Sequence, residues 1–176
     1  MKKNVLFLTQ AAAIAALYVV LTLLANALGL ANRDIQIRFS EALTILPFFT
    51  PAAIPGLYVG CLLSNILTGC IIWDVIFGSL ATLLGAVGTY LIRKRLPEWC
   101  ACIPPILANV LIIPFILAYA YQIPGIVSIF GLELKGAAVF LFMLTVGIGE
   151  IISCGILGTL LLKTLKKYRR QLFTQS

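Results

Sequence analysis

Long apolar stretches separated by short polar breaks run along the whole chain. A membrane-spanning helix needs about 20 mostly apolar residues, and six stretches are long or apolar enough to be considered. They are Val5–Leu30, Phe39–Phe49, Ala53–Ile72, Asp74–Ile92, Ala101–Tyr121 and Gly136–Leu162. The first is too long for the apolar core of a signal peptide, so we expect it to be a retained span. The pattern predicts an all-α bundle of six transmembrane helices in one domain, residues 1–176.

The second stretch differs from the others because it is short and is bounded by prolines. Pro47, Pro51 and Pro55 interrupt it or follow it closely. Irregular backbone is tolerated at membrane depth only where protein shelters it. We therefore expect this segment to be a tilted or broken span covered by its neighbours.

Composition and charge agree with a membrane location. The chain is 61% apolar and 11% charged, whereas soluble domains are near 45–50% and 25%. The basic residues flank apolar stretches, which disfavours nucleic-acid binding as the reason for the net charge of +7. With six crossings, cytoplasmic flanks would hold Lys2, Lys3, Arg93, Lys94, Arg95, Lys163, Lys166, Lys167, Arg169 and Arg170. Only Arg33, Arg38 and Lys135 would lie outside, so both termini are expected in the cytoplasm.

Several kinds of chemistry are excluded by what the chain lacks. It contains no histidine, which rules out imidazole catalysis, Ser–His and Cys–His pairs and the HExxH metal site. Its five cysteines form neither a disulfide framework nor a zinc pattern. No phosphate loop or nucleophile–base pair appears. The sequence therefore predicts no catalytic residues, no metal site and no enzymatic activity.

Two carboxylates within apolar stretches are the main candidates for a binding site. A charge in hydrocarbon is costly and usually marks function. Glu41 follows Arg38 by three residues, so the two either form an anchoring ion pair or Glu41 faces a cavity. In a cavity it could accept the paired N–H groups of an amidine- or guanine-like edge, with Arg38 orienting it. Glu150 lies mid-span without a basic neighbour, beside glycines that permit close approach, and is either a protonated structural residue or a ligand contact.

Four further polar or aromatic residues are candidates with equally plain structural alternatives. Asp74 could cap a helix or attract a cationic group, and the adjacent Trp73 could stack on a flat ring. Asn109 and Asn65 could bridge helices or bind a heterocycle. The set is expected in the outer half of the bundle. It predicts a polar, hydrogen-bond-donating and cationic small-molecule ligand.

Small residues form stripes that predict close helix packing. Two stripes follow the third and fourth stretches: Gly56, Gly60, Ser64 and Thr68, and then Gly78, Thr82, Gly85 and Thr89. For both stripes, packing within the chain is favoured over the alternative of lining a ligand site. A third stripe on the first stretch comprises Ala11, Ala12, Ala15 and Ala16. It serves either packing within the chain or docking of another membrane subunit. The connection 122–135 is expected to be a loop or lid.

Four motifs together resemble the QueT family of substrate-binding (S) components of energy-coupling factor (ECF) transporters. They are RFSEALTILP at 38–47, PAAIPG at 51–56, WD at 73–74 with FGSLATLL at 77–84, and GIGE at 147–150. The resemblance covers almost the whole chain. It implies a six-helix subunit of the bacterial plasma membrane, in contact with lipid, that captures a queuosine precursor at its outer face. The ligand would be a 7-deazaguanine base such as prequeuosine-1, or queuine.

The resemblance also implies partners and roles. A transmembrane coupling subunit would dock at the 11–16 alanines, and two ATP-binding-cassette ATPases would use the ATP, with no cofactor bound by this chain. Glu41 or Glu150 would accept the guanine edge, and the other acid or Asp74 would pair with the ligand amine. Two alternatives remain: an S component for another vitamin-like heterocycle, and a stand-alone proton-coupled carrier.

Overall fold

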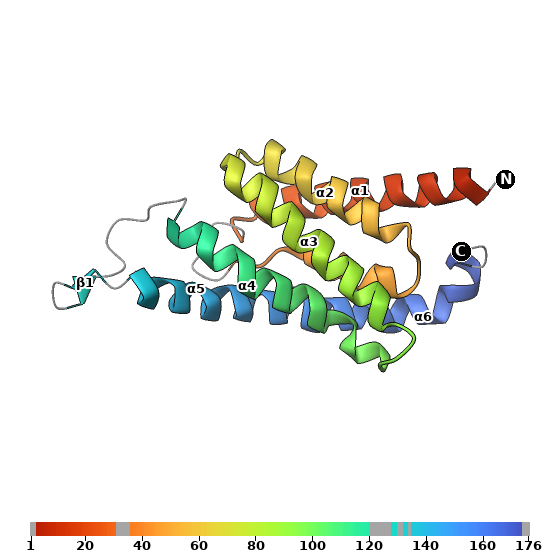
Figure 1. The fold of residues 1–176 in the computed structure, drawn as a ribbon. Coiled ribbons are helices and arrows are strands. Elements are labelled where there is room, and N and C mark those ends of the chain that lie inside the picture. Colours follow the sequence, from red (N-terminus) through yellow and green to blue (C-terminus); the bar gives the residue numbers. More distant parts are fainter. Residues whose placement is uncertain (1–2, 31–35, 120–127, 130–131, 134, 174–176) are drawn as a thin grey trace.

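A computed structural model describes residues 3–30, 36–119, 128–129, 132–133 and 135–173 of the chain. Its fold is helical (Figure 1). The first half contains α1 (Lys3–Ala27), the 3₁₀-helix η1 (Phe39–Phe48), α2 (Ala53–Leu67) and α3 (Ile72–Ile92). The second half contains the 3₁₀-helix η2 (Glu98–Cys102), α4 (Ile103–Tyr119), α5 (Lys135–Glu150), the π-helical η3 (Ile151–Gly158) and α6 (Thr159–Phe173). The strands β1 (Ser128–Ile129) and β2 (Leu132–Glu133) pair antiparallel.

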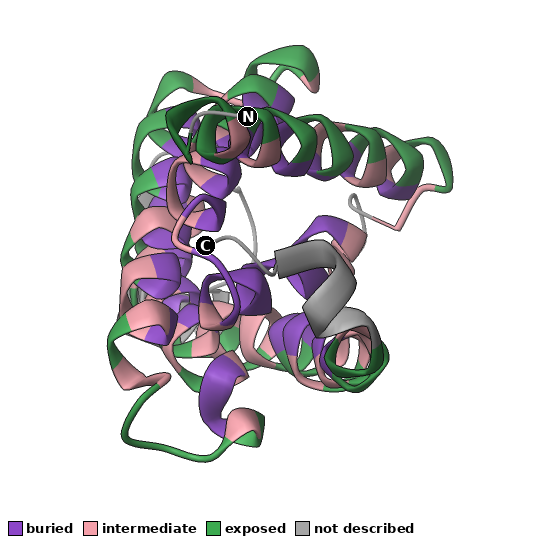
Figure 2. Cartoon of the chain, turned by 90° about the vertical axis from the view of Figure 1, so that its right-hand side faces the viewer, coloured by how far each residue is buried: buried purple, intermediate pink, exposed green. Residues whose placement is uncertain are grey.

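Four helical segments are long and apolar enough to cross a membrane. They are Lys3–Ala27, Ile72–Ile92, Glu98–Ala118 and Val139–Lys167, with mean hydropathies of 1.9 to 2.3. The six predicted spans thus become four of full length, and α2 and η1 are shorter. The start of α1 and the end of α6 lie at the same end of the bundle (Figure 1). Residues on the outer faces of the helices are largely exposed (Figure 2). Many of these exposed residues are large and apolar, as in a multi-pass membrane protein.

The second predicted span is confirmed as a short, irregular helix sheltered by protein. Every residue of η1 from Ser40 to Pro47 is buried. The helix is packed between α1, α3 and η3. Pro47 lacks a backbone N–H, which favours the short 3₁₀ form over a longer α-helix. Ten residues in that form extend about 20 Å, less than a bilayer core.

Close approach between helices confirms the packing role predicted for Gly56, Gly60 and Gly85 of α2 and α3. A Cβ on Gly56 would lie 2.7 Å from the carbonyl oxygen of Ala11, and one on Gly60 would lie 2.7 Å from the Cβ of Tyr18. A Cβ on Gly85 would lie 2.7 Å from the Cα of Pro105. These contacts draw α1 onto α2 and α3 onto α4, and the bundle closes around η1.

Some predictions concern residues that the structure does not describe. Lys2 and Arg33 lie outside the described residues. In the predicted loop or lid at 122–135, only the β1–β2 pair and the start of α5 are described.

Candidate ligand site

One cavity inside the bundle brings together four of the seven predicted ligand-binding residues. These are Arg38, Glu41, Asn109 and Glu150, contributed by the segment before η1, η1 itself, α4 and the end of α5. Its other lining residues are Gln36, Gly78, Thr82, Ile113 and Val146. The cavity has a volume of about 20 Å³, which is room for one water molecule and much less than a bicyclic base requires.

Glu150, which lines the cavity, lies where α5 meets η3, inside the continuous helical segment that α5, η3 and α6 form. Glu150 is 15 residues beyond Lys135 and 13 before Lys163. At 1.5 Å per residue, it is roughly 20 Å from each of these flanking charges. Glu150 is therefore well separated along the helix from both flanking charges, and the outer-half location of the site stays a prediction.

The two acids of the cavity share one arrangement. Glu41 is 2% exposed and its Oε1 accepts a hydrogen bond from the Tyr18 hydroxyl at 2.5 Å. Glu150 is 8% exposed and its Oε1 accepts one from Asn109 Nδ2 at 2.9 Å. Within the described part of the chain, the Oε2 atom of each acid is buried without a hydrogen-bond partner. Buried acceptors are nearly always paired, so these two oxygens are the atoms of the site that donors from a bound molecule would satisfy.

The chain between α1 and η1 is held directly against the helix that carries Glu150. The backbone N–H of Arg38 donates to Ser153 Oγ at 3.1 Å. A Cβ on Gly149 would collide with the backbone oxygen of Gln36, so only glycine allows this approach. Gly147 is less constrained, since its Cβ would make an ordinary 3.6 Å contact with Val110. The close approach expected at the GIGE motif thus occurs at Gly149.

The helix changes its winding immediately after Glu150. η3 is π-helical over Ile151–Gly158, between α5 and α6. Such wider turns are rare and occur frequently at functional sites. Here the wide turns carry Ser153 and Cys154, which contact Arg38 and Thr44 respectively.

Among the described residues, no ion pair joins Arg38 to Glu41. Arg38 Nη2 donates to Gln36 Oε1 at 3.4 Å. The carboxylate of Glu41 is instead bonded to Tyr18. The alternative of an Arg38–Glu41 anchoring pair is therefore a poor description of this site, which places a guanidinium and two carboxylates around one cavity.

Asp74 and Asn65 lie beside the cavity, behind Gly78. A Cβ on Gly78 would lie 3.2 Å from both Asp74 Oδ1 and Asn65 Nδ2, and both side chains are buried. The Asn65 amide donates to the backbone oxygen of Asp74 at 3.3 Å, which joins α2 to α3. The capping alternative for Asp74 is wrong, because α3 begins at Ile72 and its N-cap residue is Ile71.

Trp73 is not brought to this cluster. It is 53% exposed and stacks on Phe77 with ring centroids 6.0 Å apart. Adjacent residues on a helix point about 100° apart, so the turn that buries Asp74 directs Trp73 outward. Its role in ligand binding stays a prediction that the geometry does not favour.

The four alanines of α1 do not form one surface. Ala11 and Ala15 are buried and contact the glycines of α2, whereas Ala12 and Ala16 are exposed. The alternative of packing within the chain is confirmed for Ala11 and Ala15. Docking of a partner stays a prediction, now for Ala12 and Ala16.

Tyr18, which bonds Glu41, and Gln36, which lines the cavity, are residues that the sequence reasoning missed. Thr82 also lines the cavity, although packing was the favoured role for its stripe. A signal for Tyr18 was present, since the buried positions of α1 recur at helical spacing. They are Ala11, Ile14, Ala15, Tyr18, Thr22 and Ala25. No comparable signal marks Gln36, because its position depends on where the chain folds back against α5.

Comparisons with known proteins agree with a transport function. The profile of a family described as "QueT transporter" matches residues 8–167. The "Queuosine precursor transporter QueT" of Lactococcus lactis subsp. cremoris (strain MG1363) is 38% identical over 86 residues. That alignment spans 48% of this chain and 50% of the relative, so about half of each protein is compared. No solved structure matches the chain. Because the profile covers most of its length, this multi-pass membrane protein belongs to the QueT transporter family.

Proposed function

We propose that this chain is the S component of an ECF-type importer and binds a queuosine precursor for ATP-driven uptake. The ligand is a 7-deazaguanine base such as prequeuosine-1, or queuine. The observation that carries the proposal is the pair of buried carboxylates, Glu41 and Glu150, each with an unpaired oxygen at the same cavity. Family membership and the name of the Lactococcus lactis relative support this class of ligand.

The chemistry of the ligand matches the chemistry of the cavity. A deazaguanine presents a ring N–H and an exocyclic NH₂ side by side, and a carboxylate accepts such paired donors well. Each carboxylate keeps free lone pairs beyond the one already used. In prequeuosine-1 a cationic aminomethyl arm would pair with the second acid, and Arg38 or Asn109 would donate to the ring carbonyl.

The rest of the proposal concerns the assembly. The chain crosses the bacterial plasma membrane with both termini in the cytoplasm, and η1 and α2 complete the set of six helices. A transmembrane coupling subunit docks on α1, and two ABC ATPases supply the energy. The chain itself binds no cofactor and performs no chemistry.

Calorimetry with the purified chain and prequeuosine-1 tests the site. We expect Glu41→Gln and Glu150→Gln each to lose most of the affinity, because an amide replaces one acceptor by a donor. Glu98→Gln is the matched control, since Glu98 forms an exposed ion pair with Lys166 at 3.0 Å and such pairs contribute little. Wild-type affinity in both site variants would refute the assignment.

The same variants distinguish the roles of the two acids. The acid that pairs with the aminomethyl group should govern the preference for prequeuosine-1 over its nitrile precursor, which lacks the cation. The Gln variant of that acid should lose the preference, whereas the other should weaken both ligands alike. Mass spectrometry of the ligand that copurifies with the chain would show whether a different heterocycle is bound.

A stand-alone proton-coupled carrier is the second candidate, and two buried acids at one cavity within apolar segments favour it. Uptake into vesicles containing this chain alone, driven by a pH gradient and without ATP, would support it. Uptake that requires the coupling subunit, the ATPases and ATP would support the S-component function.

A further inference from the structure

Tyr18 contacts an essential part of the candidate site without lining the cavity. Its ring is 1% exposed, and its hydroxyl donates to Oε1 of Glu41. The residues lining the cavity include Glu41 but not Tyr18. Tyr18 therefore contacts a carboxylate of the cavity wall without itself lining the cavity.

The position of Tyr18 is fixed by its neighbours on two sides. Its Cβ lies where a side chain on Gly60 would have to be, so α1 and α2 are in direct backbone contact there. One turn further along α1, Thr22 Oγ1 lies 2.9 Å from the Tyr18 carbonyl oxygen and 2.8 Å from Ser40 Oγ. Two side-chain bonds thus join α1 to the first turn of η1, at Ser40 and Glu41.

We infer that Tyr18 is a positioning residue, which rotates the Glu41 carboxylate so that Oε2 faces the ligand. By occupying Oε1 it leaves one acceptor with a defined direction. Asn109 has the corresponding relation to Glu150 from α4. This inference rests on the proposed ligand site and assigns to α1 a part in ligand selection.

A positioning role makes an unusual prediction for the amide variant of Glu41. Tyr18 needs an acceptor, so in Glu41→Gln it would hold the amide oxygen and direct the NH₂ group toward the ligand. That NH₂ would face the donors of the ligand. Removing the tyrosine hydroxyl would free the amide to turn its oxygen into the cavity. Tyr18→Phe should therefore lower ligand affinity when residue 41 is Glu, and leave it unchanged or raise it when residue 41 is Gln.

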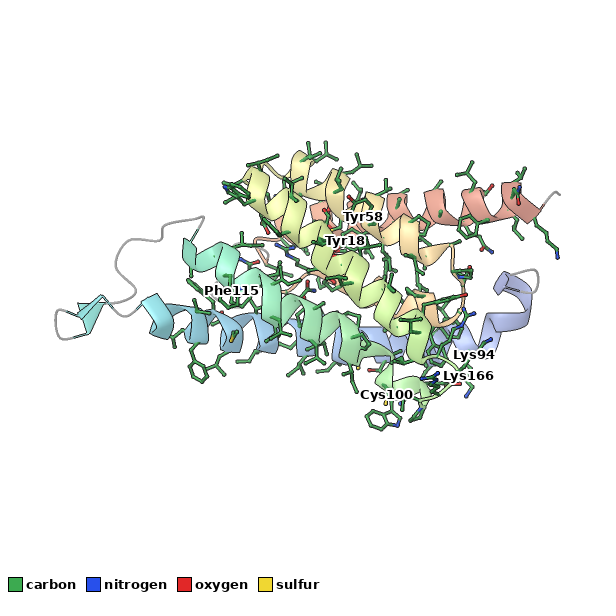
Figure 3. All side chains as sticks on the ribbon, in the orientation of Figure 1. Tyr18, Tyr58, Lys94, Cys100, Phe115 and Lys166 are labelled. Carbon is green, nitrogen blue, oxygen red and sulfur yellow. The ribbon has the colours of Figure 1, made fainter. Side chains whose placement is uncertain are left out.

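Calorimetry of the full chain with prequeuosine-1 measures this difference. In the wild-type background, Tyr18→Phe should weaken binding by roughly tenfold, which corresponds to loss of one hydrogen bond to a charged group. Tyr58→Phe is the matched control, because Tyr58 lies on α2, is partly exposed and does not line the cavity (Figure 3). In the Glu41→Gln background, Tyr18→Phe should leave the affinity unchanged or raise it.

Equal fold losses in both backgrounds, or no loss beside Glu41, would overturn the inference. If Glu41→Gln binds too weakly to measure, a gain of measurable binding on adding Tyr18→Phe supports the inference. If the double variant also binds too weakly, the single variants decide: a loss of affinity in Tyr18→Phe but not in Tyr58→Phe supports the inference, and equal affinities refute it.

A measurement without ligand separates this inference from the proposed function. The infrared band of the Glu41 carboxyl group, identified by its absence in Glu41→Gln, should shift in Tyr18→Phe and not in Tyr58→Phe. An unmoved band would refute the positioning role even if prequeuosine-1 binds. If the band shifts but the chain does not bind prequeuosine-1, the Tyr18–Glu41 bond is supported and the proposed ligand is refuted.

Discussion

Each acid of the cavity is held through one oxygen by a neutral donor from another helix, Tyr18 from α1 and Asn109 from α4. An unsatisfied buried acceptor costs about 1–3 kcal/mol, so the ligand-free site reduces the stability of the fold. Donors supplied by a ligand would recover this free energy. Binding and stability are therefore linked at these two side chains.

The donor to Glu150 can be tested against an asparagine with a purely structural bond. Asn109→Ala removes the partner of Oε1 and should lower the free energy of unfolding by about 1–3 kcal/mol while weakening ligand binding. Asn65→Ala should cost stability but little affinity, because its amide bonds the backbone of Asp74 outside the cavity. Thermal unfolding and calorimetry with prequeuosine-1 measure both quantities. Similar affinities for the two variants would contradict this distinction.

At the scale of elements, the site depends on a short non-helical segment, residues 36–38, that packs against the helical segment formed by α5 and η3. Residues 36–38 lie on α5 and η3, where Gly149 provides the space and Ser153 the hydrogen bond. This contact positions Arg38 and the start of η1 opposite Glu150. The change from α to π winding occurs at the same point.

Two glycines in one motif provide a matched test of this contact. Gly149→Ala should displace the 36–38 segment, because the new Cβ would collide with the backbone of Gln36. Overpacking of this kind typically costs about 1–3 kcal/mol, and ligand affinity should fall as Arg38 and Glu41 move. Gly147→Ala should be tolerated, since its Cβ meets Val110 at an ordinary distance. Calorimetry and thermal unfolding would disprove the argument if Gly149→Ala behaved like Gly147→Ala.

At the scale of the whole molecule, α1 is less enclosed than α3 or α4. Only 28% of its most apolar window is buried, against 44% for α3 and 39% for the segment containing α4. Its inner face carries Ala11, Ala15 and Tyr18, and its outer face exposes Ala12 and Ala16. One helix thus carries both the residue that bonds Glu41 and an exposed face of small residues, to which the proposed coupling subunit would dock.

The two faces of α1 can be separated by substitution. Ala12→Leu and Ala16→Leu should reduce copurification with the coupling subunit while leaving the affinity for prequeuosine-1 unchanged, since both side chains point away from the bundle. Ala15→Leu should instead destabilise the chain, because its backbone already lies against Gly60. If the outer substitutions left complex formation intact, docking at this face would be excluded.

The sequence predicted the features that depend on local composition. Most of the long helices were located within a few residues, whereas the last extends to Phe173 and not to Leu162. Glu41, Glu150, Asn109 and Arg38, which the sequence singled out, line one cavity. What it missed depends on three-dimensional contact. The bond between Tyr18 and Glu41 joins residues 23 apart, and the outward direction of Trp73 follows from the exact start of α3. Hydrophobic patterning also does not distinguish α from 3₁₀ or π winding.

The small size of the cavity has a kinetic consequence. A space of about 20 Å³ cannot admit a base at the first collision, so the bundle must widen before or during association. The apparent Kd is then the intrinsic Kd of the wide form divided by the fraction of molecules in that form. If widening precedes entry, the observed association rate in rapid mixing should level off as the ligand concentration rises. That plateau would give the rate at which the ligand-free protein opens. The opening rate would then be the upper limit on the rate of ligand binding.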